Sequence, residues 1–187
     1  ERRKGPKSIG QALDEGLRSL RSQHAGKPIE SIGPITWGAR LRGESGIDPW
    51  RVITYDKGSW IIHMLRRRMG DAAFLSMLGT LRKRYEFGVV STEQLRELAV
   101  EFSPKGLPDA QLENFFDTWV YSTGIPTLEL KTAVSGKAPK ITLTVTVNQS
   151  GVGEEFTTDL PVEIWMPAAK APIVHWIRTS SDGATLK

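Results

Sequence analysis

The order of apolar and polar positions divides the chain into a helical part and a strand part. Up to about residue 126, apolar residues recur every three or four positions, which is the period of an amphipathic helix. After Pro126 the period becomes two, because apolar residues at 141, 143, 145 and 147 alternate with threonines. The pattern therefore predicts an α+β fold, with a helical domain over residues 1–126 and a strand domain over residues 127–187.

Each helix expected in the first part carries one apolar stripe and ends at a recognisable boundary. Gly70 follows the second helix, and Gly124-Ile125-Pro126 stops the last one. Ser91 and Gln94 have the spacing of a capping box, in which each side chain bonds the other residue's backbone N–H. The first, second and last of the expected helices cover approximately residues 8–23, 54–69 and 108–122. The third is expected to be capped by Asp71, with its apolar stripe between Phe74 and Leu81, and the fourth to follow the Ser91 cap with apolar positions from Leu95 to Phe102.

Glycines and prolines mark the segments between these elements. From Gly26 to Ile53 they interrupt any period, so we expect a long loop with a short extended piece around residues 35–41. Turns are expected at Ser135-Gly136 and Ser150-Gly151. Four short antiparallel strands would form a small β-sandwich segment. These strands are predicted near residues 127–133, 140–148, 159–165 and 173–179.

Composition excludes several classes of function. Twenty-five Lys and Arg against 21 Asp and Glu give a net charge of +4, too small a surplus to indicate nucleic-acid binding. The absence of cysteine excludes disulfides, thiolate metal sites and a cysteine nucleophile, and it leaves the compartment open. No apolar run approaches the roughly 18 residues of a membrane span, so no membrane crossing is expected.

The candidate chemistry lies at the start of the second expected helix, in the sequence Tyr55-Asp56-Lys57-Gly58. It carries an aromatic hydroxyl, a charged pair and a glycine. The histidines, His24, His63 and His175, are too far apart to form the H-E-x-x-H pair of a helical zinc site. A lone histidine on a helix is more often a packed or exposed residue than a ligand. We therefore expect no metal site within this sequence.

Several motifs, in this order, resemble the later part of the aminopeptidase N family of gluzincin metallopeptidases. The resemblance covers roughly residues 33–165 and predicts the helical half of a thermolysin-like catalytic domain followed by a β-sandwich. The motifs that carry it are Pro34-Ile35-Thr36-Trp37-Gly38, Tyr55-Asp56-Lys57-Gly58, Met64-Leu65, Met69-Gly70-Asp71, Phe74, and Trp119 with Gly124-Ile125-Pro126.

The resemblance gives Tyr55 the role of the family's catalytic tyrosine, whose hydroxyl donates a hydrogen bond to the oxyanion of the tetrahedral intermediate. A phenol is a suitable preorganised donor at the place where negative charge develops. Gly58 would let the helix approach the substrate cleft closely. Lys57, like Gly58, is a candidate for a substrate-cleft or orienting residue. Asp56 and Lys57 are otherwise expected to be surface groups, because a charged pair at a helix start is usually solvated.

The departures from the family pattern are equally informative. The family holds zinc with two histidines of H-E-x-x-H and a downstream glutamate, and it binds the substrate amine with a Gly-x-Met-Glu-Asn sequence. None of these can be placed on this chain. We therefore expect a fragment of a zinc-dependent aminopeptidase that is inactive by itself. Zinc and the peptide substrate would be bound only in the parent protein, and the exposed cleft face would promote self-association.

Two other interpretations stay open. The chain is alternatively a noncatalytic peptidase-like scaffold or protein-interaction module that keeps the fold without the metal. It is also compatible with a helical domain unrelated to peptidases, in which Tyr-Asp-Lys-Gly is accidental. Family habit and the absence of cysteine favour a bacterial envelope or secreted protein, but they leave the localisation unknown.

Overall fold

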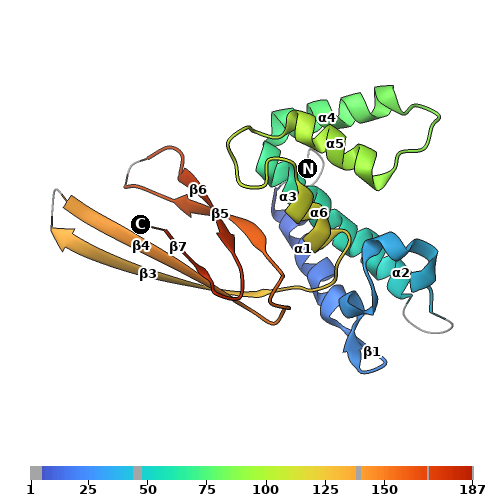
Figure 1. Cartoon of the computed structure of the whole chain (residues 1–187), viewed down its shortest axis with the longest axis horizontal. Helices are drawn as coiled ribbons and strands as arrows, with labels where there is room; N and C mark the ends of the chain where they lie inside the picture. The colour runs from blue at the N-terminus through green and yellow to red at the C-terminus, as the bar shows by residue number, and fades with distance from the viewer. Residues whose placement is uncertain (1–5, 44–47, 138–139, 168, 187) are drawn as a thin grey trace. The chain divides into compact units, whose positions relative to one another are not determined.

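The computed structural model describes residues 6–43, 48–137, 140–167 and 169–186. Contacts divide the chain into two compact units. The first runs to Lys105 and resumes at Gln111–Thr123, and the second comprises Gly106–Ala110 and Gly124–Lys187. Helices dominate the first unit, and antiparallel strands build the second (Figure 1). The expected α+β fold class is confirmed.

The expected helices are present in the first unit, with one difference at the last of them. The helix expected over residues 108–122 begins only at Glu113. Asp109 and Leu112 have φ angles of 54° and 55°, which lie outside the right-handed helical region. The α-helices of the described residues are α1 (Pro6–Arg21), α2 (Pro49–Arg51), α3 (Gly58–Met69), α4 (Asp71–Arg84), α5 (Thr92–Phe102) and α6 (Glu113–Trp119).

The segment expected to be a loop with an extended piece contains helical turns instead. A two-residue hairpin, β1 (Gln23–His24) with β2 (Lys27–Pro28), leads into the 3₁₀ turns η1 (Ile29–Ile32) and η2 (Ile35–Leu41). The prediction of an extended piece at residues 35–41 is therefore wrong. Glycine and proline interrupt an α-helical period, but they do not prevent short 3₁₀ turns, which need only three consecutive helical residues.

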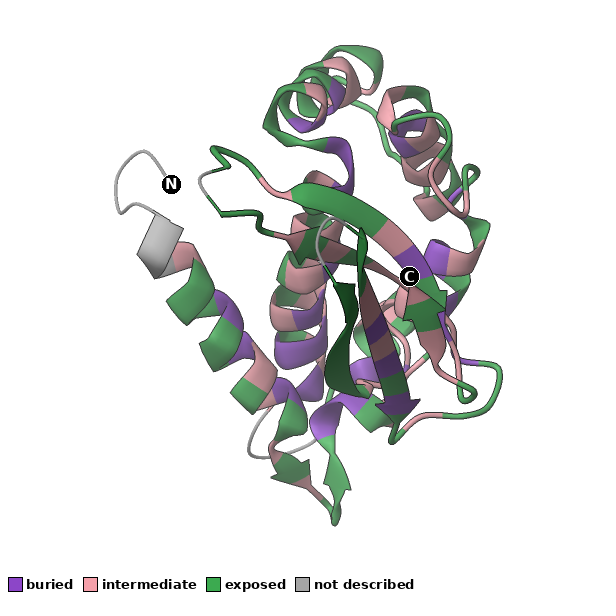
Figure 2. Ribbon diagram, turned by 90° about the vertical axis from the view of Figure 1, so that its left-hand side faces the viewer, coloured by how far each residue is buried: buried purple, intermediate pink, exposed green. Residues whose placement is uncertain are grey.

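The core of the first unit is formed by the helices from α3 onward. Figure 2 shows buried positions recurring along one side of the helices and exposed positions along the other. Burying one large apolar side chain fully contributes roughly 1.5–3 kcal/mol, so this cluster is the main source of stability in the unit. Its buried members are Ile61, Leu65, Met69, Phe74, Met77, Leu98, Ala99, Leu112, Phe115, Phe116 and Val120.

Local signals at the helix ends agree with the prediction. The Ser91 side chain accepts from the Gln94 backbone N–H at 3.1 Å, and the Gln94 side chain accepts from the Ser91 N–H at 2.9 Å. The expected capping box is confirmed. Gly70, between α3 and α4, has a φ of 79°, which residues with side chains rarely adopt. The chain can therefore turn directly from one helix into the next.

The described residues of the second unit form two antiparallel sheets. One has the order β3-β4-β7, and the other pairs β5 with β6. The hairpin of β3 and β4 runs in register from Thr127 opposite Ser150 to Lys137 opposite Lys140. Buried side chains from both sheets and the connecting loop include Val145, Val147, Phe156 and Ile177. The strands are β3 (Thr127–Lys137), β4 (Lys140–Ser150), β5 (Thr158–Ile164), β6 (Ile173–Thr179) and β7 (Ala184–Leu186).

Two features of this unit differ from the prediction. Strand β3 continues through Ser135-Gly136, where a turn was expected. Gly136 pairs with Ile141, and a Cβ on Gly136 would lie 2.3 Å from the Lys140 carbonyl oxygen. The glycine is therefore needed for close approach of two strands and does not end the strand. Strand β7 was not predicted, because three residues are too few to display a period.

Candidate functional site

The Tyr55 motif lies in a widened helical turn. The chain is helical from Pro49, and η3 (Val52–Lys57) is a six-residue π-helix that joins α2 to α3. The Asp48 carboxylate caps the start of this run by accepting from the Trp50 backbone N–H at 3.1 Å. A π turn inside a helix is rare and occurs frequently at functional sites. The helical run thus begins before residue 54, and its irregular turn coincides with the motif.

Tyr55 projects outward from this turn. Tyr55 is 59% exposed. Its ring packs edge to face against the ring of Trp50, with the two ring centroids 6.0 Å apart. The Arg42 guanidinium carbon lies 5.0 Å from the centroid of the Trp50 ring. Among the described residues, none forms a hydrogen bond with the Tyr55 hydroxyl. The ring is thus supported on one side, and its hydroxyl is accessible to a group from outside the described chain.

Lys57 is buried, so the expectation of a surface group is wrong for this residue. Its side chain and that of Glu30 are each 4% exposed, and Nζ lies 2.8 Å from Glu30 Oε1. Lys57 Nζ also donates to the Ser122 carbonyl oxygen at 2.8 Å. The ammonium group therefore joins η3 to η1 and to the chain just after α6.

A signal for this burial was present in the sequence. Ile53, Lys57, Ile61 and Leu65 follow one another at intervals of four, and all four are buried. A lysine on an apolar helical stripe needs a partner for its charge, because an isolated buried ammonium is very costly. The partner, Glu30, lies 27 residues away in a segment without helical period. Only the tertiary structure could identify it.

Gly58 has an ordinary helical conformation, with φ −56° and ψ −42°. A Cβ at this position would lie 3.5 Å from Ile35 Cδ1, which is a normal van der Waals distance. Packing within the described chain does not require glycine here. The predicted role of Gly58 in admitting a substrate stays a prediction.

Helix α1 packs against the same turn. A Cβ on Gly16 of α1 would lie 3.2 Å from the Asp56 Cβ, so the absence of a side chain at Gly16 allows this approach. Trp60 Nε1 donates to the Leu13 carbonyl oxygen at 3.0 Å and ties α1 to the start of α3. The motif turn is thus held by α1 on one side and by the Lys57 contacts on another.

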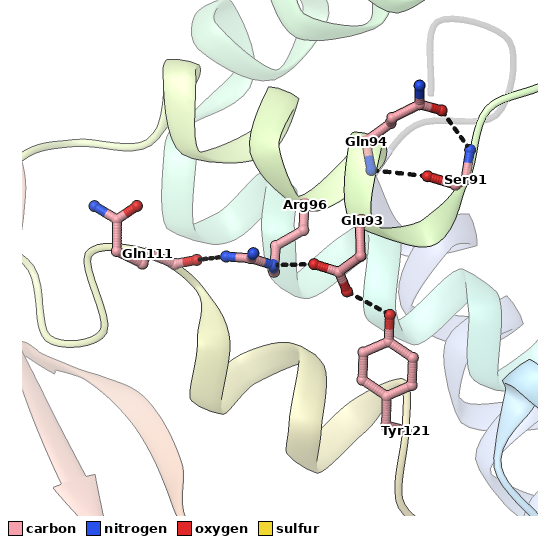
Figure 3. A network of polar contacts seen from close by, with 6 residues as sticks. All are labelled: Ser91, Glu93, Gln94, Arg96, Gln111 and Tyr121. Carbon is pink, nitrogen blue, oxygen red and sulfur yellow. Dashed lines mark hydrogen bonds and ion pairs between the residues drawn. The ribbon is translucent and has the colours of Figure 1, made fainter.

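A polar network lies close to the chain segment that Lys57 contacts (Figure 3). The Tyr121 hydroxyl donates to Glu93 at 2.5 Å, and Glu93 pairs with Arg96 at 2.8 Å. The hydrogen bond from Tyr121, followed by that from Arg96, lowers the pKa of the Glu93 carboxyl, and the same bond raises the pKa of the Tyr121 phenol. Arg96 also donates to the Gln111 carbonyl oxygen, so α5 is tied to both ends of α6.

The arginines at the end of α3 are not all solvated. Arg66 pairs with Asp71 at 2.8 Å, Arg67 is exposed, and Arg68 is only 5% exposed. The Arg66 hydrogen bond is the main cause that lowers the pKa of Asp71. The pair of Arg66 with Asp71 joins the end of α3 to the start of α4.

The histidines do not assemble into a metal site in the described part of the chain. The His63 ring meets Trp60 edge to face at 6.3 Å. No group of three or more histidine, aspartate or glutamate side chains in residues 6–43, 48–137, 140–167 and 169–186 is arranged to hold a metal ion. The residues present therefore do not fit zinc. Over the same residues, no helix has both the length and the apolar content for a membrane crossing.

Comparison with known proteins relates the chain to aminopeptidases. It is 31% identical over 102 residues to aminopeptidase N of Lactococcus lactis subsp. lactis, and these cover 54% of the chain and 11% of that protein. It is 33% identical over 79 residues to aminopeptidase M1-D of Oryza sativa subsp. japonica, and these cover 42% of the chain and 8% of that protein.

A third similar protein is aminopeptidase M1-C of Oryza sativa subsp. japonica, which is 28% identical over 124 residues, or 65% of the chain and 13% of that protein. The chain spans about a tenth of the length of the curated relatives that it matches. No family model matches it. The partial matches support an aminopeptidase-like relationship and, at that level, a peptidase-related chain.

Proposed function

We propose that this chain is part of a zinc-dependent aminopeptidase that removes N-terminal residues from peptides. The observation that carries the proposal is the exposed Tyr55 on a π turn that the buried Lys57 holds in place. The chain is also similar to aminopeptidases. Residues 1–126 would contribute the helical part of a thermolysin-like catalytic domain, and residues 127–187 a β-sandwich segment. The domain assignment and the zinc dependence are parts of the proposal.

Tyr55 would act as a hydrogen-bond donor to the reaction. Attack of water on a peptide carbonyl places negative charge on the carbonyl oxygen, and a neutral phenol can donate to that oxygen as the charge develops. The accessible Tyr55 hydroxyl, which has no hydrogen-bond partner among the described residues, suits this role. Gly58, one helical turn further on, would leave room for the substrate beside the phenol. Lys57, being buried, would not touch the substrate.

Zinc would be held elsewhere in the parent protein. The described residues do not provide a set of ligands for it, so no step of the reaction is assigned to the metal through this chain. By itself the chain is proposed to be inactive. A peptidase-like scaffold without catalysis is the second candidate function, and it is favoured by the same lack of a ligand set among the described residues.

The first experiment compares Tyr55→Phe with the unmodified sequence in a version of the protein extended upstream of Glu1, using aminoacyl-arylamide substrates. We expect kcat to fall by on the order of 100-fold or more while KM changes little, because the lost donor acts in the transition state. Tyr121→Phe is the matched control, since it also removes one phenol oxygen but from the Glu93 network. It should leave kcat/KM unchanged while lowering stability.

Each result of this comparison has a clear meaning. Full activity in Tyr55→Phe would remove Tyr55 from the mechanism. Hydrolysis by neither the variant nor the unmodified extended protein would favour the noncatalytic scaffold. Equal losses in Tyr55→Phe and Tyr121→Phe would show that the loss reflects folding and not a donor in the transition state.

A further inference from the structure

Lys57 makes contacts that tie three separate segments of the chain at one point. Its Nζ donates to Glu30 Oε1 and to the Ser122 carbonyl oxygen, each at 2.8 Å, across 27 and 65 residues of sequence. Both charged side chains are 4% exposed. Since these contacts hold the last residue of the π turn, they restrain the turn from its buried side.

The opposite side of the same turn carries Tyr55. Tyr55 and Lys57 are two residues apart, one 59% exposed and the other buried. Val52 and Ile53, at the start of the turn, are buried as well. A rotation of the turn that moved Lys57 away from Glu30 would therefore also move the Tyr55 ring along Trp50. The phenol of Tyr55 is linked to the buried ion pair through the backbone of Tyr55, Asp56 and Lys57.

Stability alone is a poor explanation for this pair. The desolvation of two buried charges can exceed their mutual attraction, and apolar replacements of similar volume are often neutral or stabilising. The π turn, by contrast, is an uncommon conformation that persists only where surrounding contacts determine it. The Lys57 contacts are directional and arrive from two segments, which suits them to selecting one conformation of the turn.

We propose that Lys57 and Glu30 are positioning residues that set the location of the Tyr55 hydroxyl. The expected effect of Lys57 and Glu30 on kcat rests on the proposed function. The structural part of the proposal, the dependence of the Tyr55 ring on the buried pair, stands apart from any activity. Neither residue is proposed to touch the substrate: Lys57 acts through the π turn to which it belongs, and Glu30 acts through its bond with Lys57.

The structural part is tested with the chain described here, labelled with 3-fluorotyrosine and observed by ¹⁹F NMR. Its three tyrosines, Tyr55, Tyr85 and Tyr121, give resonances that single Tyr→Phe variants assign. In the double variant Lys57→Met with Glu30→Gln, we expect the Tyr55 resonance to shift and broaden, because the turn is no longer restrained. The Tyr85 resonance should keep its position.

The matched control is Arg84→Met with Glu101→Gln, which removes an exposed ion pair between α4 and α5. It should leave the Tyr55 resonance unchanged. If the Lys57 and Glu30 variant does not fold, Glu30→Asp replaces it, since shortening the carboxylate by one methylene displaces Lys57 without removing the charge. A folded variant of either kind with an unshifted Tyr55 resonance overturns the proposal.

The functional part is tested in the protein extended upstream of Glu1. There the double variant should lower kcat by about 10- to 100-fold with KM nearly unchanged, the loss typical of a group displaced by about an ångström. In a Tyr55→Phe background the same change should cause no further loss, because both act through one hydroxyl. If the Tyr55 resonance shifts in the double variant but Tyr55→Phe keeps full activity, the proposed function is contradicted. The proposal that Lys57 and Glu30 position Tyr55 then still holds. Additive losses in kcat would contradict positioning through Tyr55.

Discussion

The Tyr121 hydroxyl and the Arg96 guanidinium both donate to one carboxylate, that of Glu93, and this network ends one residue before the Ser122 carbonyl that Lys57 contacts. The network is exposed and the Lys57 pair is buried, so the two differ in how they respond to solvent. Screening by water weakens the exposed charges, whereas the buried pair keeps its directional bonds. Residues that are neighbours along the chain thus have different roles.

The Glu93 network predicts a dependence of stability on pH. The pKa of Glu93 is lowered from its usual value of 4.5. Its contribution is therefore present above that value and is lost as the pH falls through the lower pKa of the folded state. We expect Glu93→Gln to lower the urea midpoint at about pH 7, and to lower it less at a pH well below 4.5, where the Glu93 carboxylate becomes protonated.

The exposed carboxylate of Glu15 on α1 provides the control. Glu15→Gln should leave the midpoint nearly unchanged at both pH values, because surface charges without a close partner contribute little. A constant difference between Glu93→Gln and the unmodified chain across this range would show that the Glu93 charge is not responsible. The raised pKa of Tyr121 acts at the alkaline end, where its contribution is lost as the pH rises through the folded-state value.

At the scale of elements, α1 contains two glycines in different surroundings. Gly10 has open space around it, whereas Gly16 is buried against Asp56 of the π turn. Glycine in the middle of a helix costs roughly 0.5–1 kcal/mol relative to alanine. Gly10→Ala should therefore raise the free energy of unfolding by about that amount.

Gly16→Ala should give no gain, or a loss, because its Cβ would lie 3.2 Å from the Asp56 Cβ and one of the elements must move. The pair of variants is compared by urea denaturation, with equal slopes required for a valid comparison. Equal stabilisation by both substitutions would show that α1 does not pack tightly against η3.

At the scale of the whole molecule, we predict self-association through the face that carries Tyr55. Trp37, in η2, which packs against η3, is 47% exposed, and Tyr55 is 59% exposed. Large exposed apolar groups promote association where they form a patch, and η2 and η3, which carry these two residues, contact each other. Light scattering should show a mass that rises with concentration, and Trp37→Asp should reduce this rise.

The control for this prediction is Phe87, which lies after α4 and is fully exposed. Phe87→Asp removes an exposed aromatic group from another part of the first unit and should leave the association unchanged. A monomer at all concentrations would contradict the prediction. A loss of association in Phe87→Asp alone would assign the contact to the segment between α4 and α5.

Local patterns were sufficient for much of this molecule. The helical period placed α1, α3, α4 and α5, and the alternation of Ile141, Leu143, Val145 and Val147 placed β4. The Ser91 and Gln94 capping box was readable because both its members lie within one helical turn. The α+β class follows from such short-range periods, since each element buries one face and its sequence records which face that is.

The surroundings of Tyr55 were decided only by the tertiary structure. The sequence motif marked Tyr55 and Lys57 but described the lysine as an orienting or surface group, because its partner Glu30 lies far along the chain in a segment without a period. The π turn is similarly invisible, since an extra residue in a helix leaves no local signal. The free energy of a buried charge depends on which groups surround it in three dimensions, and linear spacing does not record that.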